Sequence, residues 1–416
     1  MRQACLNLLQ KHIRRGCLEL VLANGQHHHF GVGQPHAKLL LYHDSALERI
    51  LRDPELMLGE TYMRGEWDAA DHDLIGLLEL LMLNFPEQRP EQRSRLSHRF
   101  KKLVARGNRI ARSYRNVAHH YDLDEWLFRR FLDEDMQYSC AYFYEPNLSL
   151  EEAQRAKCRH IMNKLRLQPG QRVLDIGCGW GGLALYLAEH AGVEVTGLTL
   201  AREQLRVAEA RARERGMEKQ VSFCLQDYRE HHGNYDRIVS VGMFEHVGVR
   251  HYHDYFDQVR RLLADDGIAL VHTIGRHGPP GATNPWIEKY IFPGGYNPAL
   301  SEMVGAIEQS GLVSCDIEVL QLHYAMTLAA WSQRFHAHRD PIKQRMGERF
   351  CRMWGFYLAS CEAAFRWRDL VVFQVQLTHR LGVTPITRNY LYRNGNPVTA
   401  LDTCPAQEAG RIQEAN

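Results

Sequence analysis

Residues 173–182 read VLDIGCGWGG and place Gly177, Gly179 and Gly182 in the spacing G-x-G-x-x-G. Glycines at this spacing let the main chain approach a small ligand closely, and Asp175 just before them is placed to meet an amino or other cationic group. The chemistry expected of such residues is nucleotide or cofactor binding. The pattern alone is a weak indication, because many strand-to-helix turns carry three glycines for packing reasons.

The residues that follow the next two expected strands indicate which ligand this turn would hold. A dinucleotide site would have an acidic residue about twenty residues past the glycines to bind the ribose, but the second strand ends in GLT at 197–199. The chain therefore argues against NAD and favours S-adenosylmethionine. Asp227 and Tyr228, after the third strand, could hold an adenine. The structural alternatives are a helix cap for Asp175 and a packing aromatic for Tyr228.

Four more residues could take part in the chemistry of a site, several of them at the ends of expected strands or just past them. They are Glu245 in VGMFEHVG, His272 in LVHTIG, Tyr324 in LHYAMTL and Cys140 in MQYSCAYF. Ligands bind at the carboxyl ends of strands in open α/β sheets. However, a lone histidine in an apolar strand is more often a core residue, and a thiol in apolar surroundings is usually inert. Spacing alone does not assemble these four residues into one site.

The elements that must position these residues form an alternating pattern from about residue 148 onward. Ser149 and Glu152 have the spacing of a capping box, which predicts a helix to about residue 165. Strands are expected at 172–176, 194–198, 221–225, 235–241 and 268–274, with helices near 181–190, 202–215 and 251–263. This βαβ repetition predicts an α/β fold with a doubly wound, Rossmann-like parallel sheet. Two long aromatic-rich helices are expected at 328–347 and 350–378.

Residues 1 to about 85 indicate a smaller N-terminal α+β domain. Strand-like runs at 18–22 and 39–42 are mixed with helical patterning at 47–58 and 74–83. Three adjacent histidines at 27–29 lie beside Gly25 and Gly31. Because three adjacent side chains cannot all face one metal, they are predicted to form a surface turn.

A basic stretch follows this domain. Residues 86–116 contain ten lysines and arginines against two acidic residues, with apolar residues at helical spacing among them. A basic amphipathic helix suits an anionic membrane surface or a nucleic-acid backbone. The alternative is a solvated helix that links two domains.

Composition sets the broad class of the protein. The chain has 416 residues, a net charge of +2, 45% hydrophobic residues and 24% charged residues, which is typical of a soluble globular protein. Its ten cysteines are scattered singly and are read as free thiols. The start has no apolar segment of signal-peptide form, and the longest apolar run, at 75–85, is too short to span a bilayer. A cytoplasmic location is therefore expected.

Eight ordered motifs resemble the cyclopropane-fatty-acyl-phospholipid synthases, a family that includes the mycolic acid cyclopropane synthases and related lipid methyltransferases. The likeness covers about 116 to 380, and DPELMLGETYMRGEWD at 53–68 resembles the N-terminal domain of the phospholipid-acting members. One departure is DE at 124–125, where the family often has Gly-Asn after HYDL. The motifs are NVAHHYDL (116–123), MQYSCAYF (136–143), VLDIGCGWGG (173–182), VTGLTLAREQ (195–204), GMFEHVG (242–248), HTIG (272–275), FPGG (292–295) and LHYAMTL (322–328).

The resemblance implies a class I methyltransferase fold and two bound groups. S-adenosylmethionine would be held by residues of four segments, and a bicarbonate ion would be held by Glu245, His272, Tyr324 and the main chain at Cys140 and Ile274. Gln204 would take the ribose role that the missing acid leaves open. The residues implied for S-adenosylmethionine are Tyr138, Ser139, Asp175, Gly177, Cys178, Gly179, Trp180, Gly181, Thr199, Leu200, Gln204, Asp227 and Tyr228.

The implied reaction is methylene transfer from S-adenosylmethionine to the cis double bond of an unsaturated acyl chain in a membrane phospholipid, giving a cyclopropane. Bound bicarbonate would take the last proton from a carbocation. The implied organisation is a lipid-associating N-terminal domain at 1–115 with its basic linker, a catalytic domain at 116–390 and a tail at 391–416. The expected assembly is a homodimer at the inner, anionic face of the membrane.

Three other functions remain open from the sequence. Methyl transfer could end in a methyl-branched acyl chain rather than a ring. The basic stretch could instead guide nucleic-acid methylation, although no RNA-binding module is recognised. A non-catalytic lipid-binding protein is a third alternative, but none of the glycines or polar site residues is missing.

Overall fold

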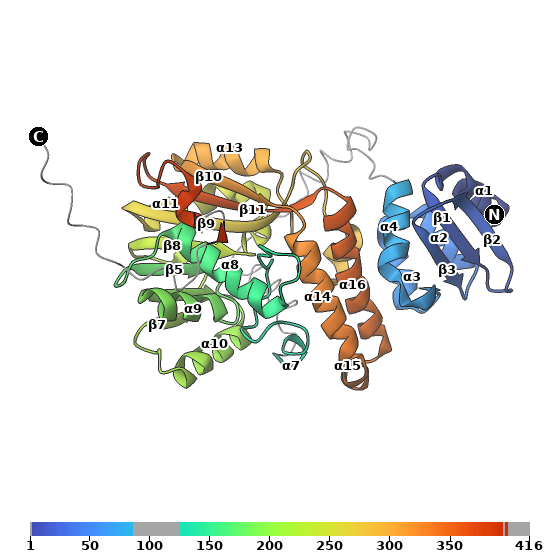
Figure 1. Cartoon of the computed structure of the whole chain (residues 1–416), viewed down its shortest axis with the longest axis horizontal. Helices are drawn as coiled ribbons and strands as arrows, with labels where there is room; N and C mark the ends of the chain where they lie inside the picture. The colour runs from blue at the N-terminus through green and yellow to red at the C-terminus, as the bar shows by residue number, and fades with distance from the viewer. Residues whose placement is uncertain (1, 86–124, 394–395, 398–416) are drawn as a thin grey trace, which may run out of the picture.

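The computed structural model describes residues 2–85, 125–393 and 396–397. Its centre is a seven-stranded sheet in the order β10-β11-β9-β8-β5-β6-β7, flanked by helices, with a four-stranded sheet at the N-terminal end of the molecule (Figure 1). The basic stretch 86–116 and the motif at 116–123 lie outside the described residues. No helix within the described ranges is long and apolar enough to cross a membrane.

The five strands expected from the sequence all form and pair in parallel. β5 (Arg172–Ile176), β6 (Glu194–Thr199), β7 (Val221–Leu225) and β8 (Tyr235–Val241) match their expected bounds within one residue, and β9 (Leu263–Arg276) is longer than expected. The α/β prediction is therefore confirmed. Alternate residues of each strand face opposite sides of a sheet, and buried apolar side chains on both faces explain the near-continuous apolar runs.

Helices cover both faces of this sheet. Val173, Val195 and Leu270 pack with α8 (Leu150–Leu165) and α9 (Gly182–Ala191) on one face. Leu174 and Val271, their neighbours in sequence, pack with α11 (Tyr252–Leu262) and α13 (Leu300–Ser310) on the other. α10 (Arg202–Glu214) follows β6. The Ser149–Glu152 capping box at the start of α8 is present, as predicted.

The prediction of a helix across 350–378 is wrong in its second half. α16 (Glu348–Trp367) ends before β11 (Leu370–Thr378), which pairs antiparallel with β9 and makes the sheet mixed. The run Leu370–Thr378 is rich in β-branched residues and is buried on both faces, which suits an inner strand better than a helix. β10 (Val313–Leu320), the edge strand beside it, was not predicted. The helix expected at 328–347 is two helices, α14 (His323–Ala337) and α15 (Arg339–Met346).

The N-terminal sheet has the order β2-β1-β3-β4, formed by β1 (Gly16–Val21), β2 (His27–Val32), β3 (His36–Leu41) and β4 (Trp67–Ala69). The three histidines at 27–29 lie in β2, so the predicted turn is wrong: the hairpin turn comes earlier, where Gly25 has φ +81°. The remaining helices of this part are α1 (Arg2–His12), α2 (Ser45–Arg52), α3 (Pro54–Met63) and α4 (Leu74–Asn84). Pro54 explains why the helix expected at 47–58 is two helices.

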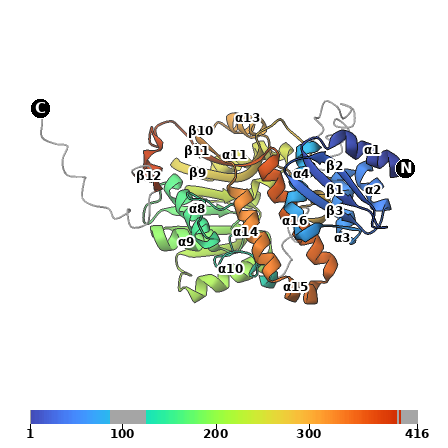
Figure 2. The same cartoon turned by 45° about the vertical axis from the view of Figure 1, so that its right-hand side comes forward.

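The N-terminal part packs on the helices beside the large sheet, where α3 and α4 lie against α16 (Figures 1 and 2). α12 (Pro285–Tyr290) also meets α3: a Cβ on Gly59 would lie 2.5 Å from Trp286 Nε1, so only glycine fits there. Glu60 accepts hydrogen bonds from Lys289 Nζ at 2.6 Å and from the Tyr290 hydroxyl at 3.0 Å. These contacts join the two parts through both apolar and charged groups.

Candidate active site

The glycine turn after β5 is shaped by close approaches that exclude side chains. Gly177 has φ +88°, and a Cβ on it would lie 2.8 Å from the Met243 side chain. The main-chain N–H groups of Gly177 and Cys178 both donate to the Leu198 carbonyl at 2.9 Å, which fixes the turn against β6. Gly179 has φ +53° and nothing within 4 Å of a Cβ among the described residues. The turn is therefore closely packed at Gly177 and open at Gly179, which leaves room for a small ligand.

The flanking residues Trp180 and Gly181 support the turn. Trp180 is buried, and its carbonyl accepts a hydrogen bond from Arg211 Nη1 at 2.9 Å. Gly181 has φ +79° and packs against Phe223 and Ala208. Cys178 is buried as well, and burial raises the pKa of its thiol well above the usual value. This thiol is therefore un-ionised near neutral pH.

Asp175 is a buried acid beside this turn. It is 1% exposed, and its Oδ2 atom has no hydrogen-bond partner in the part of the chain that the structure describes. Burial raises the pKa of this carboxyl to about 7, against the opposing effect of the nearby Lys157 ammonium. A buried carboxylate without a partner is costly. It is therefore suited to receive a cationic group of a ligand.

Tyr138, Ser139 and Cys140 lie in an irregular segment that α8 and α14 hold in place. Gln154 Nε2 donates to the Ser139 carbonyl at 3.0 Å, and Lys157 Nζ donates to the Ser139 hydroxyl oxygen at 2.8 Å. The Tyr138 hydroxyl lies 2.9 Å from the hydroxyl of Tyr357. The Cys140 thiol is buried, donates to the Ala141 carbonyl at 3.3 Å, and has a raised pKa because of its burial. The interpretation of the Cys140 thiol as inert agrees with this geometry.

The end of β6 carries the residues implied for the ribose. The Thr199 hydroxyl donates to Gln204 Oε1 at 2.9 Å and accepts from the Ala201 main-chain N–H at 3.2 Å. Both Thr199 and Gln204 are buried, while Leu200 between them is half-buried. Thr199 therefore fixes the orientation of the Gln204 amide, whose Nε2 atom is a donor.

Asp227 and Tyr228 follow β7, as expected, but the Asp227 carboxylate is already paired. It accepts from Arg229 Nε at 2.8 Å and from Arg229 Nη2 at 2.6 Å, and it caps the short helix η2 (Tyr228–Glu230). The Tyr228 ring packs edge-on against Tyr255, with ring centroids 5.3 Å apart. Asp227 therefore acts as a helix cap, and Tyr228 has the packing role that was the alternative for it.

Glu245 lies in the short helix η3 (Phe244–His246) after β8, with its carboxyl group buried. Its Oε1 atom accepts a hydrogen bond from the Ile274 main-chain N–H at 2.6 Å, and its Oε2 atom has no partner within the described ranges. Burial raises the pKa of this carboxyl to about 7, against the opposing effects of the Ile274 main-chain N–H and the Thr273 hydroxyl. Ile274 is half-buried, and its main-chain N–H donates to Glu245. This N–H group therefore holds the Glu245 carboxyl group and is not directed at a separate ion.

His272 and Tyr324 are both buried. The Nδ1 atom of His272 lies 3.1 Å from Gln374 Nε2, and burial lowers the pKa of the imidazole to about 3. The ring is therefore neutral, and with Nδ1 accepting from Gln374 its proton is on Nε2. Burial raises the pKa of Tyr324 well above the usual value, with further contributions from Tyr138, Cys140 and Glu245. The Tyr324 hydroxyl is therefore a neutral donor close to those three groups.

The carboxyl ends of the parallel strands bring these residues to one edge of the sheet. β5 ends at Asp175 and Ile176, β6 at Thr199 and β8 just before Glu245. The main-chain N–H of Gly242 donates to the His272 carbonyl at 2.9 Å, which ties the end of β8 to β9. The structure therefore brings the glycine turn, Asp175 and Glu245 to this edge, where ligand sites lie in α/β sheets, while Tyr324 comes from α14.

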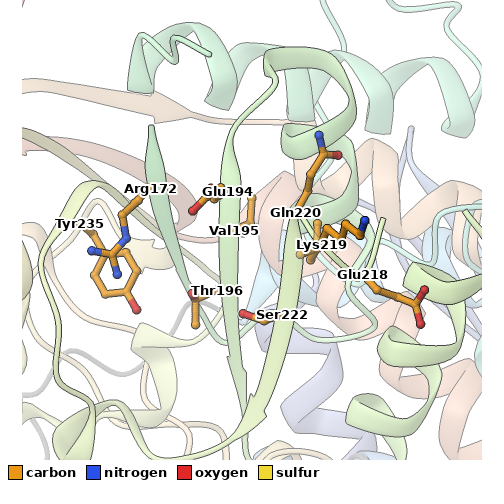
Figure 3. A pocket seen from close by; sticks show the side chains of 10 residues that line it. Arg172, Glu194, Val195, Thr196, Glu218, Lys219, Gln220, Ser222 and Tyr235 are labelled. Carbon is orange, nitrogen blue, oxygen red and sulfur yellow. The ribbon is translucent and has the colours of Figure 1, made fainter. Parts of the chain in front are cut away.

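Figure 3 shows a polar pocket at the other end of the strands. Arg172, Glu194 and Tyr235, which line it, are the first residues of β5, β6 and β8. The Arg172 guanidinium lies over the Tyr235 ring, 5.1 Å from its centroid. This pocket is at the amino ends of the parallel strands and contains none of the residues expected to do chemistry.

Sequence reasoning missed Lys157, Gln154 and Gln374. Lys157 and Gln154 lie on the buried side of α8, and a signal existed: polar residues at 154, 157 and 164 recur at helical spacing within an apolar stripe. Gln374 gave no comparable signal. It meets His272 because β11 pairs antiparallel with β9 in a register that sets these two residues opposite each other.

The sheet, the glycine turn after its first parallel strand and the buried acid beside that turn define a class I S-adenosylmethionine-dependent methyltransferase. A family model described as mycolic acid cyclopropane synthetase matches residues 108–375, and the chain belongs to this family. It is thus an S-adenosylmethionine-dependent methyltransferase of the cyclopropane synthase type.

Three relatives illustrate the range of the similarity. The chain is 41% identical over 350 residues to the cyclopropane-fatty-acyl-phospholipid synthase of Escherichia coli K12, covering 82% of this chain and 88% of the relative. It is 36% identical over 362 residues to the tuberculostearic acid methyltransferase UfaA1 of Mycobacterium tuberculosis, covering 83% and 84%. The solved structure of the mycolic acid cyclopropane synthase CmaA1 complexed with SAH and CTAB has a TM-score of 0.61 and 34% identity, covering 64% of this chain and 97% of that chain.

Proposed function

We propose that this enzyme converts cis double bonds of unsaturated acyl chains in membrane phospholipids into cyclopropane rings, with S-adenosylmethionine as the methylene source. The observation that carries the proposal is the buried carboxyl group of Glu245. Its Oε1 atom is fixed by Ile274 N–H at 2.6 Å, its Oε2 atom has no partner among the described residues, and Tyr324 is near enough to feel its charge. Ring closure needs a base in a dry site, and this arrangement could hold one.

S-adenosylmethionine, when bound, would supply an electrophilic methyl group on a sulfonium centre. The open main chain at Gly179 and the partnerless Oδ2 of Asp175 fit such a ligand, because one gives room and the other an anion for an ammonium group. The Ser139 hydroxyl would donate a hydrogen bond to the carboxylate of the cofactor. Gln204, fixed by Thr199, would donate to its ribose. The other residues assigned to this group are Tyr138, Gly177, Cys178, Trp180, Gly181, Leu200, Asp227 and Tyr228, with Asp227 acting while paired to Arg229.

Bicarbonate, when bound, would supply a base for the proton that leaves the transferred methyl group. The residues present fit this ion: Glu245 offers a buried acceptor for its O–H group, and His272 and Tyr324 are neutral donors. The main chain at Cys140 is assigned to the same ion. Ile274 would act through Glu245, since its N–H group is bound there. Glu245 would thus orient the base and would not be the base itself.

The reacting alkene is a weak nucleophile, so positioning and exclusion of water must supply most of the acceleration. Fixing two groups in a reactive geometry can contribute about 7–11 kcal/mol. A carbocation near aromatic faces gains about 2 kcal/mol when desolvated. Tyr138 and Tyr324 lie around Trp331, with ring centroids 5.2 Å and 5.8 Å from it. The buried rings of Tyr324 and Trp331 and the half-buried ring of Tyr138 are suited to protect a cation from water.

The organisation proposed for the chain follows from the same function. Residues 1–115, with the basic stretch 86–116, would associate with an anionic membrane surface at the cytoplasmic face, and residues 116–390 would carry out catalysis, followed by a tail at 391–416. Electrostatic attraction of lysines and arginines to anionic lipids would hold the enzyme at its substrate. A homodimer is the proposed assembly.

A methyl-branched product is the second candidate. The chain is 36% identical to a tuberculostearic acid methyltransferase. This similarity supports methyl transfer to an acyl chain that ends in a branch instead of a ring. The buried Glu245, His272 and Tyr324 set favours ring closure, because it provides for removal of the proton from the transferred methyl group.

The test is lipid mass spectrometry after incubating the full chain with S-adenosylmethionine and vesicles of unsaturated phosphatidylglycerol and phosphatidylethanolamine. Cyclopropanation adds one CH2 per double bond and gives a product that takes up no hydrogen under mild catalytic hydrogenation. A saturated methyl branch would instead add one carbon and four hydrogens per double bond, and it would form only when a hydride donor is supplied. A product that gains CH2 but still takes up hydrogen would indicate a methylene branch. Removing dissolved carbon dioxide should lower the rate, and added bicarbonate should restore it. Unchanged lipids together with methylated RNA would overturn the proposal.

A further inference from the structure

Helix α8 carries a fully buried lysine beside the segment assigned to the cofactor. Lys157 is 0% exposed, and its Nζ atom donates to Gln137 Oε1 at 2.6 Å and to the Ser139 hydroxyl oxygen at 2.8 Å. Burying an ammonium group is costly unless an opposite charge compensates it. Both acceptors are neutral, so the compensating charge must come from other groups.

Two buried acids are close enough to supply that charge. The Lys157 ammonium opposes the effect of burial on the pKa of both Asp133 and Asp175. Asp133 is already bound, since its carboxylate accepts the main-chain N–H groups of Gln137 at 2.8 Å and Asp135 at 3.1 Å. Asp175 Oδ2 has no partner within the described part of the chain. Asp175 therefore depends on Lys157 without the main-chain donors that Asp133 has at its carboxylate.

The other titratable groups facing Asp175 do not supply a charge near neutral pH. On α8, burial raises the pKa of the Cys158 thiol to about 12, and in the glycine turn it raises the pKa of the Cys178 thiol well above its usual value. Both thiols are therefore neutral. Among the described residues, Lys157 is the cation that acts on this carboxyl group.

Lys157 also orients the hydroxyl group of Ser139. Gln154, one turn earlier on α8, donates to the main-chain carbonyls of Gln137 at 3.3 Å and Ser139 at 3.0 Å, while Lys157 binds their side chains. Because Lys157 donates to the Ser139 oxygen, the hydroxyl hydrogen of Ser139 must point elsewhere. It is left to donate to an acceptor such as a ligand carboxylate.

We propose that Lys157 is a positioning residue for S-adenosylmethionine, which it serves by orienting the Ser139 hydroxyl and by placing a positive charge near the Asp175 carboxyl group. The amino-acid end of the cofactor carries a carboxylate and an ammonium group. A fixed hydroxyl donor and an anion are the complementary partners for these two groups. The inference rests on the proposed roles of Ser139 and Asp175 and requires no contact between Lys157 and the ligand.

The experiment measures S-adenosylmethionine binding to the full chain by titration calorimetry between pH 6 and 9. Lys157→Met removes the charge at similar volume, so Asp175 should ionise at higher pH. A rise of about one unit lowers the ionised fraction at pH 7 from about one half to about one tenth, which weakens binding about fivefold. Affinity falls at low pH as Asp175 becomes protonated, and this acid limb of the affinity profile should move to higher pH by the same amount. Lys157→Arg, which keeps the charge, should keep the limb near its wild-type position.

Lys164→Met is the matched control. Lys164 lies on the same helix and is also 0% exposed, but its ammonium pairs with Glu318 at 2.6 Å. Its loss should lower stability and leave the acid limb of cofactor binding in place. In an Asp175→Asn background the limb should be absent, and Lys157→Met should shift nothing further.

A wild-type acid limb in Lys157→Met would overturn the inference. So would a loss of affinity without any shift of the acid limb, since damage to packing alone would do the same; the pH-independent loss expected from a misoriented Ser139 hydroxyl must accompany the shifted limb. If the Met variant does not fold, Lys157→Gln, which is polar but uncharged, is measured in its place with the same criteria. All readouts concern cofactor binding. A wild-type protein that binds S-adenosylmethionine but modifies no phospholipid would therefore overturn the proposed function and leave this inference standing.

Discussion

Glu245 and Ile274 are joined across the end of the sheet: the Glu245 carboxylate accepts the main-chain N–H of Ile274 at 2.6 Å. The bond connects η3, which follows β8, to the last part of β9. It fixes one carboxylate oxygen and leaves the other buried without a partner among the described residues. A group held in this way can orient a small ion through the free oxygen, and this relationship motivates the first two predictions.

Glu245→Gln should abolish most turnover while preserving the fold. The amide keeps an oxygen for Ile274 but presents an NH2 group where the acceptor oxygen stood, so it cannot receive an O–H group. Loss of a properly oriented base typically costs about 10²- to 10⁴-fold in rate. We expect a fall in kcat of this size, measured by lipid mass spectrometry, with S-adenosylmethionine binding unchanged.

Glu362→Gln is the control for this variant. Glu362 has the same 7% exposure as Glu245 but lies on α16 and accepts from Arg366 Nε at 2.8 Å. It should retain turnover. Wild-type-like activity in Glu245→Gln would contradict the assignment of Glu245.

Tyr324→Phe should reduce turnover by removing one donor and keeping the ring. A hydrogen bond to a charged group contributes about 1.5–3 kcal/mol, so the rate should fall about 10- to 100-fold. Raising the bicarbonate concentration should recover part of the loss. Tyr255→Phe provides the comparison, since the Tyr255 hydroxyl is also buried and unpartnered within the described ranges but packs among Phe244 and Phe256. Equal effects of the two variants would show that the Tyr324 hydroxyl has no special role.

Much of the fold could be predicted because the parallel strands are apolar runs bounded by clear helix patterns. The strand at Leu370–Thr378 could not, because aromatic residues continue from α16 into it and only tertiary pairing with β9 decides its conformation. The same pairing brings Gln374 to His272. Local sequence patterns contain no information on which residue of a distant strand will lie opposite a given one.

The candidate site could also be predicted only in part from the sequence. Gly177, Asp175 and Glu245 could be placed from the sequence, because strand ends meet at one edge of a parallel sheet. The pairing of Asp227 with Arg229, two residues later, depends on side-chain conformation rather than on residue type. The role of Lys157 could not be predicted because a lysine on an amphipathic helix is usually solvent-exposed.

Gly177→Ala should damage both the turn and cofactor binding. Gly177 has φ +88°, and an added Cβ would lie 2.8 Å from Met243. The conformation alone costs a non-glycine residue about 1–2 kcal/mol, and the contact adds to this because Met243 must move. We expect a lower melting temperature and weaker S-adenosylmethionine binding, measured by calorimetry. Gly170→Ala separates the two effects: its φ is +80° but nothing described lies within 4 Å of a Cβ. It should lose stability through strain alone and bind the cofactor normally.

Asp175→Asn should stabilise the ligand-free enzyme at alkaline pH and weaken cofactor binding. Burial raises the pKa of Asp175 from 3.8 to about 7, so the folded state binds this proton more tightly than the unfolded state does. Its contribution to stability is therefore fully present below about pH 4 and is lost as the pH rises toward and through 7. Asparagine cannot ionise, and by pH 8 it removes a cost on the order of 2–4 kcal/mol.

Differential scanning calorimetry at pH 5 and pH 8, with and without S-adenosylmethionine, checks this prediction. Without ligand, the variant should melt above wild type at pH 8, and the difference should shrink at pH 5, where Asp175 is protonated in the folded state. With ligand, wild type should gain stability by the mass action of binding, and the variant should gain less. A variant that melts below wild type at pH 8 without ligand would mean that the Asp175 carboxylate already has a stabilising partner. In that case the Asp175 carboxylate would not be available to pair with the ammonium group of the cofactor.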